Sequence, residues 1–148
     1  MKMSDLITPG AILTGLKVSS KEQCLDRLSQ HAAGLIGTAS EVIGSALKRR
    51  EALGSTGIGG GIAMPHAPVA GLSAPIGLLA CLAKPVDFEA VDGEPVDIVC
   101  LILTPDAAQG LHLNALACVA RRLQRPEVRD AIRRARQPQG VHAALCEA

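Results

Sequence analysis

The segment between residues 50 and 66 contains three kinds of group that suit phosphate chemistry. Arg50 stands at the end of a charged run, residues 54–61 form a glycine-rich stretch, and His66 follows a short apolar run. An imidazole is neutral and nucleophilic near pH 7, a guanidinium matches two phosphate oxygens, and loop N–H groups stabilise negative charge. The pattern predicts a phosphoryl acceptor in which His66 is the nucleophile.

The glycine-rich stretch is the expected phosphoryl-binding loop, because five of its eight residues are glycine. Its candidate binding residues are Ser55, Thr56, Gly57, Gly59, Gly60 and Gly61. A Walker loop would end in Gly-Lys-Ser/Thr, and a dinucleotide-binding loop would run from a strand into a helix. This loop follows an expected helix and enters a strand. It contains no GxSxG motif, so a serine nucleophile is not expected.

The whole run resembles the active-site segment of a known family. It reads Arg-Glu-x-Leu-Gly-Ser-Thr-Gly-Ile-Gly-x-Gly-Ile-Ala-x-Pro-His. This is very similar to the mannitol/fructose-type enzyme IIA family of the bacterial phosphotransferase system, and most similar to its nitrogen-regulatory branch. Further similar segments follow in order: Val86-Asp87-Phe88, Ala90-Val91-Asp92-Gly93, Pro95-Val96-Asp97-Ile98-Val99, Leu103-Thr104-Pro105 and His112-Leu113-x-x-Leu116-Ala117. The resemblance covers nearly the whole chain.

The resemblance implies a role for three residues. His66 matches the phosphorylated histidine, His112 the neighbouring active-site histidine, and Arg50 the arginine at the helix end. The charge run Lys48-Arg49-Arg50-Glu51 leaves open whether Arg49 or Arg50 acts, and it would also suit a helix C-terminus that simply carries cations.

The chain departs from the family pattern at two places. Gly60 stands where the family often has Asn, which removes one possible hydrogen bond near the phosphoryl site, and Ala67 stands where Gly is frequent. Neither departure touches the two histidines or the arginine. His31 and His142 match nothing in the family and are expected to be surface or packing residues.

The implied activity is that of a histidine phosphocarrier. A phosphohistidine on a small HPr-like carrier would transfer its phosphoryl group to His66, with no metal and no organic cofactor implied. We expect a regulatory, nitrogen- or potassium-type role, exerted on a kinase or transporter. Two alternatives remain: a sugar-specific enzyme IIA that passes phosphate to a separate enzyme IIB, and a non-catalytic binding module. The intact trio of His66, His112 and Arg50 argues against the last.

Composition excludes several other classes of function. A chain of 148 residues suits one domain, expected here over residues 1–148, and its net charge of +1 provides no field for nucleic acid or an anionic membrane. Seven arginines between residues 121 and 136 indicate either a solvated, salt-bridged helical face or a docking surface for an acidic partner. With Phe88 as the only aromatic residue, stacking on nucleic-acid bases is not expected.

The cysteines and the N-terminus bear on the compartment. The five cysteines are widely spaced with no CxxC pair, so they are expected to be small core residues in a reducing compartment. The N-terminus has too few apolar residues for a signal sequence, and no apolar run approaches the length of a membrane span. We therefore expect a soluble, cytoplasmic protein.

Hydrophobic periodicity and turn signals predict the elements that must hold the site. Capping-box signals at residues 19–22 and 38–41 open two helices, the first over about 20–36 and the second ending near residue 53. A loop is expected over residues 54–61, a short strand over 62–64 and a second loop from His66 to Gly71. Buried strands over 76–82 and 96–103 flank an Asp92-Gly93 turn, and helices follow at 107–124, 126–135 and 138–147. This order suggests an α/β or α+β fold with a mixed β-sheet, and the family resemblance implies helices on both faces.

Overall fold

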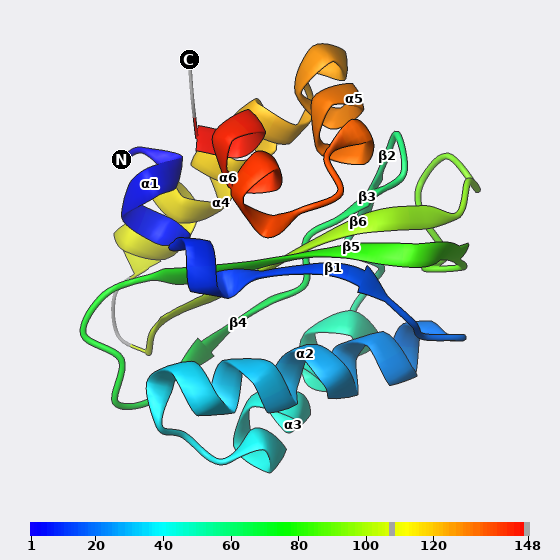
Figure 1. Cartoon of the computed structure of the whole chain (residues 1–148). Coiled ribbons are helices and arrows are strands. Elements are labelled where there is room, and N and C mark those ends of the chain that lie inside the picture. Colours follow the sequence, from blue (N-terminus) through cyan, green and yellow to red (C-terminus); the bar gives the residue numbers. More distant parts are fainter. Residues whose placement is uncertain (107–108, 147–148) are drawn as a thin grey trace.

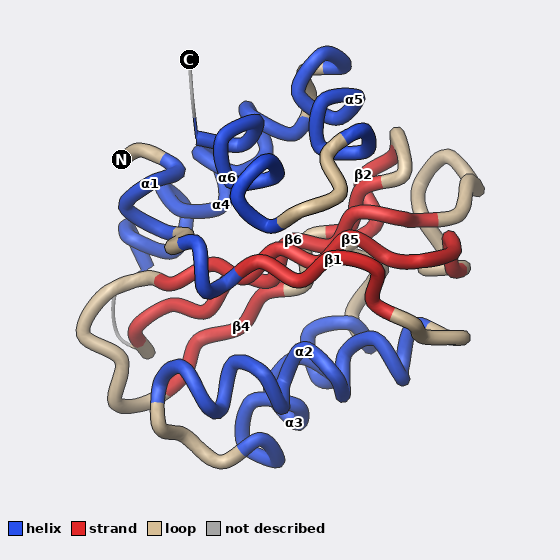
Figure 2. The backbone as a smooth tube through the Cα atoms, in the orientation of Figure 1, coloured by secondary structure: helices blue, strands red, loops and turns tan. Residues whose placement is uncertain are grey.

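A mixed six-stranded sheet lies between two layers of helices in the computed structural model, which describes residues 1–106 and 109–146. One face is covered by α2 (Lys21–Ile36) and α3 (Ser40–Ala52). The other face carries α1 (Met3–Leu6), α4 (Gln109–Leu123), α5 (Pro126–Arg134) and α6 (Pro138–Cys146), as Figures 1 and 2 show. The predicted mixed sheet with helices on both faces is confirmed.

The sheet is built around one buried strand, β6 (Val96–Pro105). On one side β6 pairs antiparallel with β5 (Ile76–Val86), which pairs in turn with the parallel strand β1 (Ile12–Leu16). On its other side β6 pairs in parallel first with β3 (Ile62–Ala63) and then with β4 (His66–Val69). The edge strand β2 (Gly57–Gly59) pairs antiparallel with β3. The chain that leads to His66 is therefore held along the central strand.

The predicted buried strands form the centre of the core, and both are longer than expected. Apolar side chains of β5 and β6 pack with Phe88, which is fully buried. Three of the cysteines behave as core residues, since Cys24, Cys100 and Cys118 are buried. Burial raises the pKa of the Cys24 and Cys100 thiols to about 12, so neither is a ready thiolate.

The predicted helices are confirmed to within a few residues at each end. The caps differ in detail. Ser20 caps α2 by accepting a hydrogen bond from the N–H of Gln23 (3.1 Å), so the partner in the helix is Gln23 and not Glu22. The second capping box is wrong, because the N-cap of α3 is Ala39, which has no hydroxyl to offer. Residues 107, 108 and 147, at the ends of two predicted helices, lie outside the described residues.

Two stretches predicted as loops contain strands. Residues 57–59 form the edge strand β2, where an ideal Cβ on Gly57 would lie 2.7 Å from Cβ of Ala90. The hairpin turn after it has positive φ at Gly59, Gly60 and Gly61, a conformation that glycine adopts without strain. His66 begins β4 and not a loop, and Pro68 is tolerated there because β4 pairs only with β6, on one side.

The N-terminal elements were not predicted from the sequence. α1 is only one turn long, a 3-10 turn over Pro9–Ala11 follows, and β1 is a five-residue strand interrupted by Gly15 at φ +62. Short elements of this kind carry little periodicity, and β1 is held in place by its pairing with β5.

Four of the seven clustered arginines bind groups within the protein. Arg122 donates to the carbonyls of Leu145 (2.7 Å) and Ala144 (3.1 Å), and Arg133 pairs with Asp97 (2.9 Å). The other two are Arg125, paired with Glu127, and Arg129, which donates to the carbonyls of Leu123 and Gln124. These contacts favour the salt-bridged helical face over a free docking surface.

No helix within residues 1–106 and 109–146 is long and apolar enough to cross a membrane.

Candidate active site

His66 lies at the start of β4, opposite Ile102 of β6, with its ring half-buried. Its Nδ1 is 2.8 Å from the carbonyl oxygen of Met64. A carbonyl oxygen can only accept, so Nδ1 carries the proton. In the neutral ring this leaves the lone pair on Nε2.

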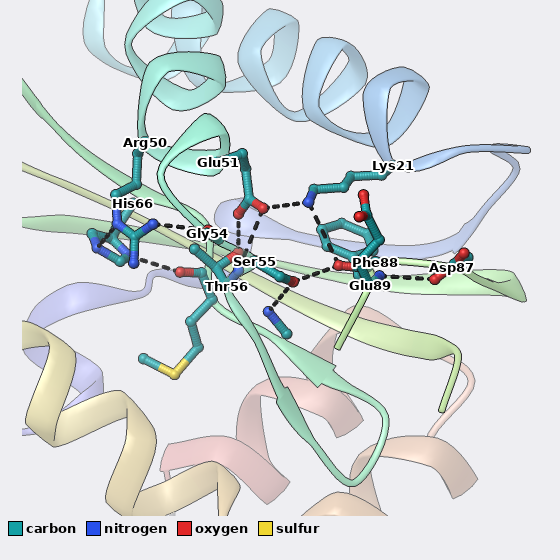
Figure 3. A network of polar contacts seen from close by, with 12 residues as sticks. Lys21, Arg50, Glu51, Gly54, Ser55, Thr56, His66, Asp87, Phe88 and Glu89 are labelled. Atoms are coloured by element: carbon teal, nitrogen blue, oxygen red, sulfur yellow. Dashed lines mark hydrogen bonds and ion pairs between the residues drawn. The ribbon is translucent and has the colours of Figure 1, made fainter. Parts of the chain in front are cut away.

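Arg50 reaches Nε2 of this ring from the last turn of α3, as Figure 3 shows. Its Nε donates to Nε2 of His66 (3.2 Å), and its Nη1 donates to the carbonyl of Gly54 (2.9 Å). Because Nε2 accepts this bond, the ring is neutral with its proton on Nδ1. Arg49, one residue earlier, is exposed on the helix. Of the two arginines that the sequence left open, the structure brings Arg50 to the histidine.

The surroundings of His66 favour the unprotonated, nucleophilic ring. Burial lowers the pKa of His66 from its ordinary value of 6.5 because it penalises the charged form. The Met64 carbonyl opposes this effect, whereas Arg50 and His112 lower the pKa further. The imidazole therefore stays neutral over a wider range of pH than an exposed histidine would.

His112 approaches His66 from the first turns of α4. The two ring centroids are 5.3 Å apart and the rings are inclined at 59°. Nδ1 of His112 is 2.8 Å from the hydroxyl oxygen of Thr104, a fully buried residue near the end of β6. This contact orients the ring and leaves Nε2 of His112 for a ligand. The structure thus gathers His66, His112 and Arg50 from three different elements.

The hydroxyls of the glycine-rich segment are engaged within the protein. Ser55 donates to the carbonyl of Phe88 and accepts from the N–H of Gly57 (3.0 Å), while the hydroxyl of Thr56 donates to the carboxylate of Glu51. The N–H of Thr56 also donates to Glu51 (3.3 Å). These groups shape the loop, and the phosphoryl-binding role of residues 55–61 stays a prediction.

The glycines at residues 59–61 turn at the tip of the β2–β3 hairpin, which Figure 1 shows close to α5. The N–H of Gly60 donates to Asp92 (3.0 Å), and its carbonyl accepts from Arg133 of α5 (2.7 Å). A Cβ on Gly60 would lie 3.1 Å from Arg129. A side chain at position 60 would therefore first meet Arg129 of α5.

Sequence reasoning missed three contributors to the site: Glu51, the Met64 carbonyl and Thr104. Glu51 stands inside the run that resembles the family, and Thr104 follows a predicted strand. The sequence therefore drew attention to both positions, but it did not show what either side chain contacts. The other histidines are packing residues, as expected. His31 contacts the carbonyl of Gly10 (3.3 Å), and His142 contacts that of Ile7 (3.1 Å).

Comparison with known proteins shows the family of the chain. Residues 5–148 match the family described as phosphoenolpyruvate-dependent sugar phosphotransferase system, EIIA 2. The nitrogen regulatory protein of Bradyrhizobium diazoefficiens is 42% identical over 145 residues, covering 98% of this chain and 95% of the relative. That of Pseudomonas aeruginosa is 37% identical over 148 residues, covering 99% and 96%.

Solved structures share the fold. The crystal structure of nitrogen regulatory protein IIA-Ntr from Neisseria meningitidis superimposes with a TM-score of 0.90 at 28% identity, covering 97% of this chain and 98% of that one. Escherichia coli IIA mannitol has a TM-score of 0.78 at 19% identity, with 94% and 98% covered, and shows the fold alone. The chain therefore belongs to the EIIA 2 family of the phosphoenolpyruvate-dependent sugar phosphotransferase system, and is similar to nitrogen regulatory proteins over nearly its whole length.

Proposed function

We propose that this protein is a histidine phosphocarrier that accepts a phosphoryl group on Nε2 of His66. The observation that carries the proposal is the pair of hydrogen bonds at the ring, with Met64 holding the proton on Nδ1 and Arg50 facing the lone pair on Nε2. The ring is thereby prepared as a nucleophile at one nitrogen only.

The donor is a phosphohistidine on a small HPr-like carrier protein. Nε2 of His66 attacks phosphorus in line, and the Nε2–P bond forms as the P–N bond of the donor breaks. The donor imidazole leaves with the electron pair of that bond. The proton of His66 stays on Nδ1, where the Met64 carbonyl stabilises the positive charge that develops on the ring.

Arg50 and His112 stabilise the charge of the transferring group. Once Nε2 bonds to phosphorus it no longer accepts from Arg50, and the freed guanidinium is then adjacent to the phosphoryl oxygens. In the tautomer in which the Thr104 hydroxyl donates to Nδ1 of His112, Nε2 carries the proton and donates to the same oxygens from the opposite helix layer. Preorganised donors of this kind need little rearrangement during transfer.

The biological role that we propose is regulation of a target kinase or transporter according to the phosphorylation state of His66. Its support is the similarity to nitrogen regulatory proteins along nearly the whole chain, which favours this role over transfer to a sugar-specific enzyme IIB. The thiols of Cys24, Cys81, Cys100 and Cys118 form no disulfide within the described residues, which is compatible with a reducing cytoplasm where such a relay would operate.

Incubation with a phosphorylated HPr-like donor, followed by intact-mass measurement, tests the proposal. We expect one added phosphoryl group that is lost in acid and retained in base, as for a phosphoramidate. Nitrogen-15 NMR should place it on Nε2 and not on Nδ1. Substitution His66→Ala should prevent the addition. A label on serine or threonine, or undiminished labelling of His66→Ala, would refute the proposed function.

A further inference from the structure

Glu51 is a charged residue that the phosphoryl-transfer step does not use, yet its side chain is only 6% exposed. A buried carboxylate is costly unless it is paired and hydrogen-bonded. Here it is both. Lys21 of α2 lies 2.6 Å from one carboxylate oxygen, and Thr56 donates both its hydroxyl and its N–H to the carboxylate. Figure 3 shows this side chain turned away from Arg50, its neighbour on α3.

Glu51 is linked to both nitrogens of His66, through hydrogen bonds on one side and through the backbone of α3 on the other. On one side the carbonyl of Thr56 accepts from the N–H of Met64 (2.9 Å), whose own carbonyl accepts the proton on Nδ1. On the other side Arg50, adjacent to Glu51 in the last turn of α3, donates to Nε2. The helix end and the strand that carries His66 are thus joined through one carboxylate.

We propose that Glu51 is a positioning residue, which holds the end of α3 and the segment around Thr56 so that Arg50 and the Met64 carbonyl both meet the ring of His66. The inference rests on the proposed function, because correct placement of the ring matters only if the ring reacts. A misplacement of about 1 Å can cost about a hundredfold in rate. Lys21 neutralises the carboxylate, and the Thr56 hydroxyl directs it.

The competing explanation is that the Lys21–Glu51 pair merely fastens α2 to α3. The protein contains a matched control for this explanation, because Lys48 of α3 pairs with Asp26 of α2 at 2.9 Å. That pair joins the same two helices, but its side chains are 45% and 49% exposed, and Thr56 hydrogen-bonds to Glu51 and not to this pair. A general packing role predicts similar effects from the two pairs, whereas a positioning role predicts an effect from Glu51 alone.

The experiment compares four variants: Glu51→Gln, Thr56→Val, Thr56→Ser and Lys48→Gln. Glutamine keeps the shape of Glu51 but removes its charge, and valine keeps the shape of Thr56 but removes the hydroxyl. Two readouts are taken on each folded variant: the NMR resonances of the Arg50 Nε–H and the His66 ring nitrogens, and the rate of phosphoryl uptake from a phosphorylated HPr-like donor.

Glu51→Gln and Thr56→Val should shift the Arg50 Nε–H resonance toward that of a solvent-exposed arginine and slow phosphoryl uptake by about two- to tenfold. Thr56→Ser keeps the hydroxyl and should match the wild type in both readouts. Lys48→Gln should also match the wild type in both. Unmoved resonances in Glu51→Gln and Thr56→Val, or equal shifts in Lys48→Gln, would overturn the inference. Failure of the wild-type protein to take up phosphate would refute the proposed function instead, and the resonances would still decide whether Glu51 holds Arg50.

Discussion

Substitution of Arg50 by lysine tests whether the guanidinium acts in phosphoryl transfer or merely places a positive charge at the end of α3. Arg50 uses two nitrogens for two acceptors: Nε bonds His66 (3.2 Å) and Nη1 bonds the carbonyl of Gly54 (2.9 Å). A lysine keeps the charge but has one nitrogen, so it cannot span both acceptors or engage two phosphoryl oxygens in a planar fork.

The expected size of the effect follows from the contact that is lost. A hydrogen bond to a charged group contributes about 1.5–3 kcal/mol. If this contact is made in the transition state, its loss slows transfer by roughly tenfold to 150-fold. Arg49→Lys is the control, because Arg49 is exposed on the same helix turn. This substitution should leave the transfer rate nearly unchanged.

Rapid-quench measurement of transfer from a phosphorylated HPr-like donor gives the rate for each variant, and thermal unfolding recorded alongside excludes a folding defect. Equal rates for Arg50→Lys and the wild type would show that charge alone suffices. A larger loss at Arg49 would show that the wrong arginine has been assigned to the site.

Three further outcomes are expected. Because burial lowers the pKa of His66 below 6.5, the unfolded ring takes up a proton before the native ring does as the pH falls. This contribution of His66 to the free energy of unfolding is therefore present above pH 6.5 and is lost as the pH falls below it. Urea titrations at decreasing pH should show a shrinking difference in unfolding free energy between the wild type and His66→Gln. Thr104→Val should slow transfer by about two- to tenfold by releasing Nδ1 of His112, whereas Thr104→Ser should not; identical rates for the two variants would contradict the orienting role. Gly57→Ala should lose about 1–3 kcal/mol in denaturant unfolding because its Cβ would meet Ala90 at 2.7 Å, whereas Gly34→Ala in α2, with open space at its Cβ, should gain up to about 1 kcal/mol. If Gly57→Ala were as stable as the wild type, the edge strand β2 could move away from Ala90 at little cost in free energy.

The glycine-rich segment shows where sequence reasoning stopped. Its composition correctly excluded a helix, but it also suggested a free loop of phosphate-binding donors. In the structure the segment forms a hairpin, and its polar groups bind Glu51, Phe88, Asp92 and Arg133. Phe88, Asp92 and Arg133 are distant in sequence, and Glu51 reaches the segment only because α3 packs beside it. No local pattern of residues could therefore identify these partners.

The sequence by itself predicted the two central strands and the longer helices, and it indicated His66 as the candidate nucleophile. Apolar runs predicted β5 and β6, helical periodicity predicted five of the helices, and the run ending at His66 indicated the reacting residue. These features are local, since each depends on residue types within one or two turns or one strand.

Only the tertiary structure decided which groups surround the ring of His66. It placed the proton on Nδ1 through the Met64 carbonyl, selected Arg50 over Arg49, and oriented His112 through Thr104. Each of these depends on which way a side chain points when α3, β4 and α4 pack on one sheet. Hydrogen bonds between such elements are set by distances of a few tenths of an ångström, and a linear pattern of residue types does not contain those distances.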